Sequence, residues 1–161
     1  MAIEIDVMGD YWASGHDQRT ELGELVHRAK DLGDSTAATL LADRFGIFLA
    51  SIGAADASIV PMPASPDRPA ILLTVVAGDR GRPMVVRRAA TGRLRDLAPE
   101  DRPAAVHAGG YEVTAACDGM HLILLDDVVL TGTTLQHVGD LLLAAGAASV
   151  RGVALARTRR R

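Results

Sequence analysis

Apolar and polar residues alternate along the chain with two different periods, and these periods predict most of its elements. Residues 3–7 alternate strictly between apolar and acidic, which is the period of a half-exposed strand. Over residues 19–31 and again over 40–52, apolar residues recur every three or four positions, which predicts two amphipathic helices. Gly33 separates them, as expected at a helix end. A short strand is predicted at 57–60.

The middle of the chain is less regular. Residues 70–77 (AILLTVVA) fit a strand by composition and a helix by spacing. We favour a helix, because the apolar positions 71, 72, 75 and 76 suit one helix face. A turn at 78–81 and a strand at 83–86 are predicted to follow.

The stretch HLILLDDVVLTGTT at 121–134 carries the strongest chemical pattern in the chain. Its four apolar residues, 122–125, predict a strand buried on both faces, as in a parallel sheet. Asp126 and Asp127 are predicted at the carboxyl end of that strand, followed by a polar turn at 131–134. A helix is predicted to begin there and to stop at Gly146.

This order of elements suits a sugar phosphate. Backbone N–H groups at a helix start bind phosphate, Gly132 allows close approach, and the neighbouring threonines add hydroxyl donors. Carboxylates repel phosphate, so the acid pair is expected to accept hydrogen bonds from sugar hydroxyls or to meet a cation that the ligand carries. The pattern therefore indicates a ribose 5-phosphate site.

Three other interpretations share part of the pattern. Thr133 and Gln136 fit a capping box, in which Thr133 would only cap the helix. A P-loop nucleotidase needs a glycine-rich loop ending in lysine, and the only lysine, Lys30, is not preceded by glycine. A receiver domain carries its acids near its start, with several strand–helix units after them, whereas only 34 residues follow Asp127.

Composition narrows the class of protein. The 161 residues are 48% hydrophobic, enough for one domain with a core, and the net charge of −3 disfavours a nucleic-acid-coating surface. The single cysteine, Cys117, excludes an internal disulfide, and no histidine spacing indicates a zinc site, so we predict no protein-held metal. The sequence begins without a leader pattern and no stretch reaches transmembrane length, so we expect a cytoplasmic protein.

The motif at 122–134 resembles the phosphoribosyl-pyrophosphate (PRPP) motif of type I phosphoribosyltransferases. The resemblance implies an α/β chain with a Rossmann-like, mostly parallel twisted sheet flanked by helices. It implies that Asp126 and Asp127 contact the ribose hydroxyls and act as the catalytic pair. It also implies that the loop binds the 5-phosphate through Leu130, Thr131, Gly132, Thr133 and Thr134. Leu130 departs from the family, which usually has a small or hydroxylated residue there.

Residues 25–34 and 146–158 further resemble the ComF-like (competence protein F-like) branch, whereas 61–82 match weakly. The family's pyrophosphate loop would fall at 64–68, with Arg68 as its cation, although a proline-stiffened turn explains that segment equally well. Six arginines and no acid lie between residues 80 and 95. They suit phosphate contacts and a solvated loop equally, and Arg87 and Arg88 are the candidates for pyrophosphate contact.

The resemblance implies a pentosyltransferase that moves a phosphoribosyl group from PRPP to a nitrogenous base, with Mg²⁺ bound mainly through PRPP. The alternative is a non-catalytic PRPP or nucleotide sensor, or a ComF-like accessory protein in DNA uptake or repair. We expect one domain over 1–161 with an N-terminal helical extension at 1–54. PRPP is the expected partner, no membrane contact is expected, and a homodimer and a nucleic-acid contact stay open.

Overall fold

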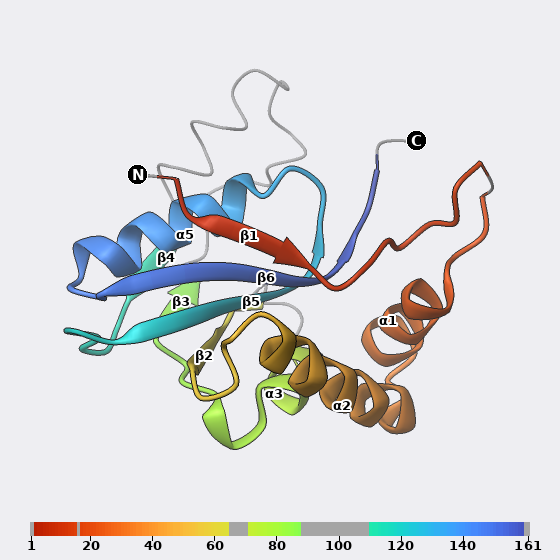
Figure 1. Cartoon of the computed structure of the whole chain (residues 1–161), viewed down its shortest axis with the longest axis horizontal. Helices are drawn as coiled ribbons and strands as arrows, with labels where there is room; N and C mark the ends of the chain where they lie inside the picture. Colours follow the sequence, from red (N-terminus) through yellow and green to blue (C-terminus); the bar gives the residue numbers. More distant parts are fainter. Residues whose placement is uncertain (1, 16, 65–70, 88–109, 160–161) are drawn as a thin grey trace.

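The computed structural model describes residues 2–15, 17–64, 71–87 and 110–159 (Figure 1). The elements are, in chain order, β1 (Glu4–Val7), α1 (Glu21–Asp31), α2 (Ser35–Ser51), β2 (Ser58–Pro61), α3 (Ile71–Ala77), the 3₁₀ turn η1 (Gly78–Arg80), β3 (Val85–Arg87), β4 (Tyr111–Val113), β5 (His121–Val129), α5 (Thr133–Ala144) and β6 (Ser149–Arg157).

The sheet is parallel. Its strands lie in the order β1-β6-β5-β2, and all three neighbouring pairs run in the same direction. β5 and β6 are the long central strands, and their inner residues are buried because neighbours cover both edges and helices cover the faces. β3 and β4 form a separate antiparallel pair. The predicted mostly parallel sheet is therefore confirmed.

Helices flank the sheet in two groups. α1, α2 and α3 pack on one another, with α3 also against β2 and β5, whereas α5 packs against β5 and β6 and lies apart from the other three (Figure 1). One continuous cluster of buried apolar side chains joins both groups to the sheet. Phe45 and Leu41 of α2 and Leu135 and Leu142 of α5 are fully buried in it.

The predicted helices of the N-terminal part are present. Thr20 caps α1 by accepting from the Gly23 amide, and Asp34 caps α2 by accepting from the Ala37 amide. Gly33 lies between them in the left-handed region, at φ 67°, a conformation that glycine adopts readily. The helix that spacing favoured at 70–77 is confirmed as α3.

The expected strand at 3–7 is confirmed as β1, and it joins the sheet. β1 pairs with β6, the last strand of the chain, with Glu4 opposite Arg151. Arg151 donates to the carboxylates of Asp6 and Glu4 and to the carbonyl of Ile52, so it ties β6 to both β1 and the end of α2. Segment 1–54 thus contains a sheet strand as well as helices. Its status as an extension of one domain stays a prediction.

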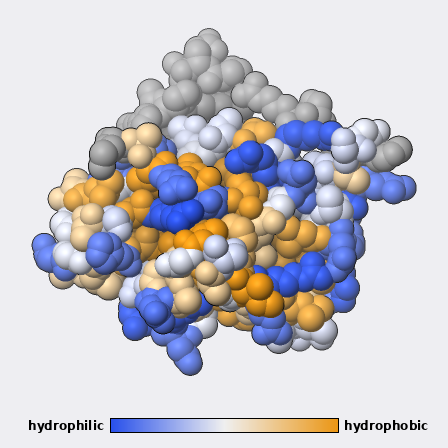
Figure 2. Space-filling model, viewed as in Figure 1, coloured by the Kyte–Doolittle hydropathy of each residue, from blue (hydrophilic) through white to orange (hydrophobic). Residues whose placement is uncertain are grey.

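Hydrophobic residues gather in the middle of the face seen in Figure 2, with hydrophilic residues among and around them. Exposed large apolar side chains follow the end of α1 and lie on α2 and α3, namely Leu32, Leu40, Ile47, Ile71 and Val75. In the described ranges, each helix is too short or too polar to cross a membrane.

Candidate functional site

The acid pair lies inside strand β5. The four residues before it are 0–3% exposed, which confirms the predicted buried run. The expectation that the strand ends at the acids is wrong, since β5 continues to Val129. Its pairing with β6 persists through Asp126 opposite Ala154 and Val128 opposite Ala156. The extra pairing holds the backbone of both acids in the sheet, so their carboxylates project from a rigid element.

Each carboxylate of the pair has defined partners. Asp126 Oδ1 accepts from the amide of Asp127 at 2.9 Å, and Asp127 Oδ1 accepts from the amide of Val128 at 2.6 Å. Asp127 Oδ2 lies 2.8 Å from Nζ of Lys30, which reaches it from the last turn of α1. About two-fifths of the Lys30 side chain is exposed, and its ammonium pairs with Asp127.

Burial affects the charge of Asp126. Removal from water, the larger cause, and repulsion from Asp127 together raise the pKa of Asp126 from its ordinary value of 3.8 to about 6. The amide of Asp127 and the ammonium of Lys30 act against this increase in the pKa. Asp126 is therefore ionised at neutral pH and becomes protonated in mildly acidic solution.

Asp126→Asn is expected to stabilise the free protein above pH 6. The folded protein binds more protons at Asp126 than the unfolded chain does between pH 3.8 and about 6, so stability falls as the pH rises through this window. Asparagine does not titrate, and its carbonyl can still accept from the Asp127 amide. We expect a gain of about 1–3 kcal/mol at pH 8, shrinking towards zero near pH 4, since one pKa unit is about 1.4 kcal/mol. Urea unfolding at pH 4, 5, 6 and 8 measures it.

The exposed Asp43 on α2 provides the control for that experiment. Asp43→Asn is expected to change the free energy of unfolding by less than about 0.5 kcal/mol at every pH. A destabilised Asp126→Asn protein at pH 8, or a gain of equal size at pH 4, would contradict the assignment of a raised pKa to this carboxyl.

The turn after β5 is built around Gly132. This glycine is the N-cap of α5 and has φ 80°, in the left-handed region. A Cβ placed on it would lie 2.7 Å from Cδ1 of Ile5 in β1, so the backbone also approaches β1 closely. The capping-box interpretation is wrong: Thr133 is the first residue of the helix, and the Gln136 side chain accepts from the Ile3 amide and donates to Asp140.

The first turn of α5 differs from those of α1 and α2. Its N-cap, Gly132, has no side chain to cap the helix, whereas Thr20 and Asp34 cap the other two helices. The amide of Thr133 makes only a long contact, 3.4 Å, with the hydroxyl of Thr131. Thr131 and Thr133 are exposed, and their hydroxyl oxygens lie 2.9 Å apart. Hydroxyls and helix-start amides therefore meet at the surface, an arrangement that suits an anion. Thr134 is half-buried, and Leu130 is exposed at the start of the turn.

Of the three arginines predicted to contact PRPP, Arg87 is the one that lies in the described part of the chain. Arg87 is half-buried on β3, with its guanidinium carbon 5.8 Å from the centre of the Tyr111 ring on β4. Burial raises the pKa of Tyr111, Arg87 lowers it and Asp126 raises it, so both charges act on this ring. Arg80 and Arg82 donate to nearby backbone carbonyls. The other candidates, Arg68 and Arg88, lie outside the described residues, as do Arg93 and Arg95.

A pocket of about 560 Å³ opens beside the acid pair. Asp126, Asp127 and Lys30 share its wall with apolar residues that follow β2 or lie on α2 and α3, such as Ala38, Met62, Leu72 and Leu73. A mainly apolar cavity with a few convergent polar groups is typical of small-molecule sites. The acid pair therefore faces a space large enough for a ligand.

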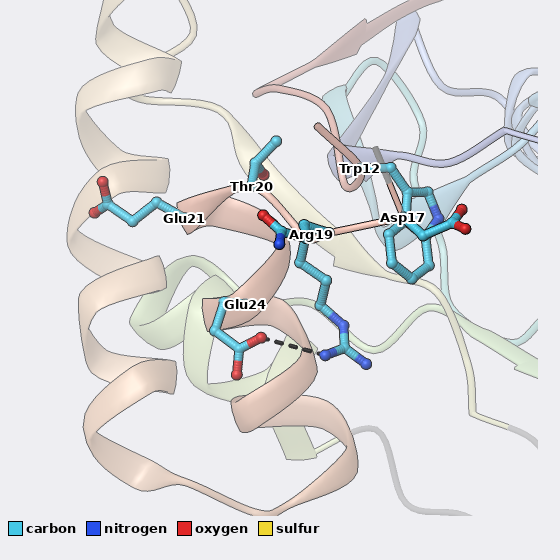
Figure 3. Close-up of a pocket in the computed structure, with 7 residues that line it drawn as sticks. Trp12, Asp17, Arg19, Thr20, Glu21 and Glu24 are labelled. Atoms are coloured by element: carbon cyan, nitrogen blue, oxygen red, sulfur yellow. Dashed lines mark hydrogen bonds and ion pairs between the residues drawn. The ribbon is translucent and has the colours of Figure 1, made fainter. Parts of the chain in front are cut away.

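A second pocket, of about 550 Å³, lies at the start of α1 (Figure 3). Arg19 lines it together with Trp12, Asp17, Gln18, Thr20, Glu21 and Glu24, and its guanidinium points toward Glu24 (Figure 3). Arg19 already donates to Glu24 at 3.3 Å and to the Tyr11 hydroxyl at 3.2 Å. Of the residues predicted to bind PRPP, those in the described ranges do not line this pocket, whereas Asp126 and Asp127 line the other one, so the candidate site is the one beside the acid pair.

Comparison with known families agrees with this geometry. The model of the family described as "Phosphoribosyl transferase domain" matches residues 70–161, more than half of the chain. The chain belongs to the phosphoribosyl transferase domain family. The matched region contains the acid pair, the turn at Gly132 and α5, and the parallel sheet with flanking helices confirms the type I fold that the resemblance implied.

The similarity to individual curated proteins covers a smaller part of the chain than the family model does. The DNA utilization proteins YhgH of Salmonella typhi and Salmonella typhimurium are each 48% identical to the chain over 48 residues. The aligned part is 30% of this chain and 21% of each relative, so it spans about a fifth of their length. This likeness supports the resemblance to the ComF-like branch.

Solved structures of related fold include a Trypanosoma cruzi hypoxanthine phosphoribosyl transferase and an allosteric regulatory enzyme of purine biosynthesis. The first is 14% identical, covers 87% of this chain and 69% of its own, and has a TM-score of 0.47. The second is 18% identical, covers 73% of this chain and 26% of its own, and has a TM-score of 0.49.

Sequence analysis alone missed two parts of the site. Lys30 was not assigned to the site because its partner is 97 positions away, and no local pattern reports such a contact. Tyr111, beside Arg87, lies on a strand that was not predicted, because β4 has only three residues. The signal available for Lys30 was its place in the segment 25–34 that resembles the ComF-like branch.

Proposed function

We propose that this chain binds PRPP at the acid pair and the Gly132 turn and transfers its phosphoribosyl group to a nitrogenous acceptor. In that reaction the bond from ribose C1 to the pyrophosphate oxygen breaks and a bond from C1 to the acceptor nitrogen forms. The residues of the chain would position the ligand and complement its charges. Positioning and electrostatic stabilisation dominate catalysis of this kind.

One observation carries the proposal: two carboxylates fixed in β5 are followed, within six residues, by a helix start whose N-cap is Gly132, which has no capping side chain. Asp126 and Asp127 would accept from the two ribose hydroxyls. The amides after Gly132 and the hydroxyls of Thr131 and Thr133 would hold the 5-phosphate. Family membership, which covers this whole region, supports the same roles.

Mg²⁺ enters this proposal as part of the substrate. In the described part of the chain, metal-binding side chains do not gather in groups of three or more, whereas the pyrophosphate of PRPP is rich in the oxygen donors that Mg²⁺ prefers. The ion would help pyrophosphate leave by offsetting its negative charge. Arg87, and the arginines at 68 and 88, are proposed to assist on the same side.

A non-catalytic role is the second candidate. Leu130 places an exposed apolar side chain at the start of the phosphate turn, where a small or hydroxylated residue would be expected from the family resemblance. The likeness to proteins named for DNA utilization points the same way. The chain would then sense PRPP or a nucleotide, as an accessory protein in DNA uptake or repair.

Calorimetry with PRPP and Mg²⁺, followed by assays of pyrophosphate release with a panel of nucleobases, separates the two candidates. Binding with release supports the transferase, and binding without release for any base supports the sensor. Absence of PRPP binding to the folded wild-type protein would overturn both.

Thr133→Val is expected to weaken binding of ribose 5-phosphate at least about tenfold. The exposed hydroxyl is proposed to donate to the phosphate, and one such hydrogen bond to a charged group contributes about 1.5–3 kcal/mol. Competition between ribose 5-phosphate and PRPP gives the affinity. Thr36→Val changes a similarly exposed threonine in the first turn of α2 and should leave the affinity unaltered; equal affinity in both variants would remove Thr133 from the site.

A further inference from the structure

Lys30 reaches the acid pair from outside the region that the family model matches. The family model begins at residue 70, whereas Lys30 lies in the last turn of α1. Its ammonium is 2.8 Å from Asp127 Oδ2, and Lys30, Asp126 and Asp127 line the same pocket. The sequence contains no other lysine, although it has sixteen arginines. The N-terminal helix thus supplies a cation to a site whose acids come from the domain.

We propose that Lys30 is a positioning residue of the PRPP site, which holds the Asp127 carboxylate beside Asp126 so that both acids accept from the ribose hydroxyls. The inference rests on the proposed function and extends the site to α1. A carboxylate oxygen can accept two hydrogen bonds, so Asp127 Oδ2 can accept from Lys30 and from a sugar hydroxyl together. Lys30 therefore need not leave when the ligand arrives.

The positive charge of the Lys30 ammonium favours ionisation of the acid pair. Two neighbouring carboxylates that are withdrawn from water tend to share a proton, because both cannot ionise easily. A protonated acid becomes a donor, and a diol whose two hydroxyls both donate would then lose one acceptor. The ammonium favours the fully ionised pair. It also offsets repulsion between the pair and a ligand that carries phosphates.

The remaining charged groups around the pair come from other elements. Asp34, at the start of α2, lines the pocket but pairs with Arg28 at 2.5 Å. Tyr111 of β4 interacts electrostatically with Asp126 and with Arg87 of β3. Among the described residues, Lys30 is the cation that directly contacts a carboxylate of the pair.

Lys30→Met tests the inference, with Lys30→Arg as the conservative variant. We expect Lys30→Met to weaken ribose 5-phosphate about tenfold at pH 7 and to move the pH midpoint of binding upward by about one unit, as expected for loss of a neighbouring opposite charge. Lys30→Arg keeps the positive charge, so its affinity for ribose 5-phosphate and its pH midpoint of binding should both lie close to those of the wild type. Calorimetry between pH 5 and 9 measures the affinity. The phosphate of the ligand also titrates, equally for all variants, so the difference between variants is the measured quantity.

Arg44→Met is the matched control, because Arg44 has the same side-chain exposure as Lys30 and pairs with Glu21 across α1 and α2, away from the acid pair. It should leave affinity and midpoint as in the wild type. Carbon-13 spectra of the aspartate carboxyls give a second measurement, in which Lys30→Met should raise the titration midpoint of the pair without ligand.

The inference is overturned if wild-type protein binds ribose 5-phosphate while folded Lys30→Met shows the same pH midpoint. It is also overturned if Arg44→Met shifts the midpoint as much as Lys30→Met. If the wild-type protein binds neither ribose 5-phosphate nor PRPP, the proposed function itself is wrong. The carboxyl titrations would still report whether Lys30 controls the charge of the pair.

Discussion

The double variant Asp126→Asn with Asp127→Asn is expected to bind PRPP at least about 100-fold more weakly than the wild type. Each hydrogen bond from a ribose hydroxyl to a carboxylate contributes about 1.5–3 kcal/mol, and 1.4 kcal/mol is tenfold in affinity. The change is isosteric, and asparagine oxygens can still accept from the amides of Asp127 and Val128, so β5 should keep its geometry. Calorimetry with PRPP and Mg²⁺ gives the affinity.

Thermal unfolding shows whether the double variant is folded, and Asp43→Asn controls for loss of one surface charge. We expect Asp43→Asn to bind PRPP as the wild type does, because Asp43 is exposed on α2 and does not line the pocket. A folded double variant with unchanged affinity would show that the acids do not contact the ligand.

Gly132→Ala is expected to disrupt the phosphate turn and to destabilise the protein by about 2–4 kcal/mol. An L-residue in the left-handed region costs about 1–2 kcal/mol, and the new Cβ would lie 2.7 Å from Ile5 Cδ1, which forces an overpacked contact. Relief of that contact would rotate the turn, so ribose 5-phosphate affinity should fall at least about tenfold. Urea unfolding and calorimetry measure the two effects.

Two further variants separate the causes. Gly53 has φ 73° with nothing within 4 Å of its Cβ position, so Gly53→Ala should lose only the conformational part, about 1 kcal/mol. Ile5→Val removes the Cδ1 atom and should recover part of the stability when it is combined with Gly132→Ala. Equal losses for Gly132→Ala and Gly53→Ala would mean that the approach of Gly132 to β1 is not tight.

Local patterns predicted those parts of the fold that local forces determine. The buried run before the acids predicted β5, since a segment with no polar side chain is stable only where it is covered on both faces. The spacing of apolar residues predicted α1, α2 and α5, and the signals for helix ends at Gly33 and Gly146 were correct. These features depend on neighbours within a few positions.

Features that depend on distant contacts were not predictable in the same way. β5 continues through the acid pair because β6 pairs with it, and β6 begins about twenty residues later. Gln136, expected to complete a capping box, instead accepts from the Ile3 amide across 133 positions. Lys30 pairs with Asp127 because α1 packs beside the sheet's acid pair in three dimensions. No periodicity in one segment records any of these contacts.

A crystal of the protein soaked with ribose 5-phosphate tests the central claim most directly. We predict density for the phosphate at the amides that follow Gly132, with the two ribose hydroxyls within hydrogen-bonding distance of Asp126 and Asp127. Ligand bound elsewhere at saturating concentration, or a phosphate that does not touch the turn, would contradict the account.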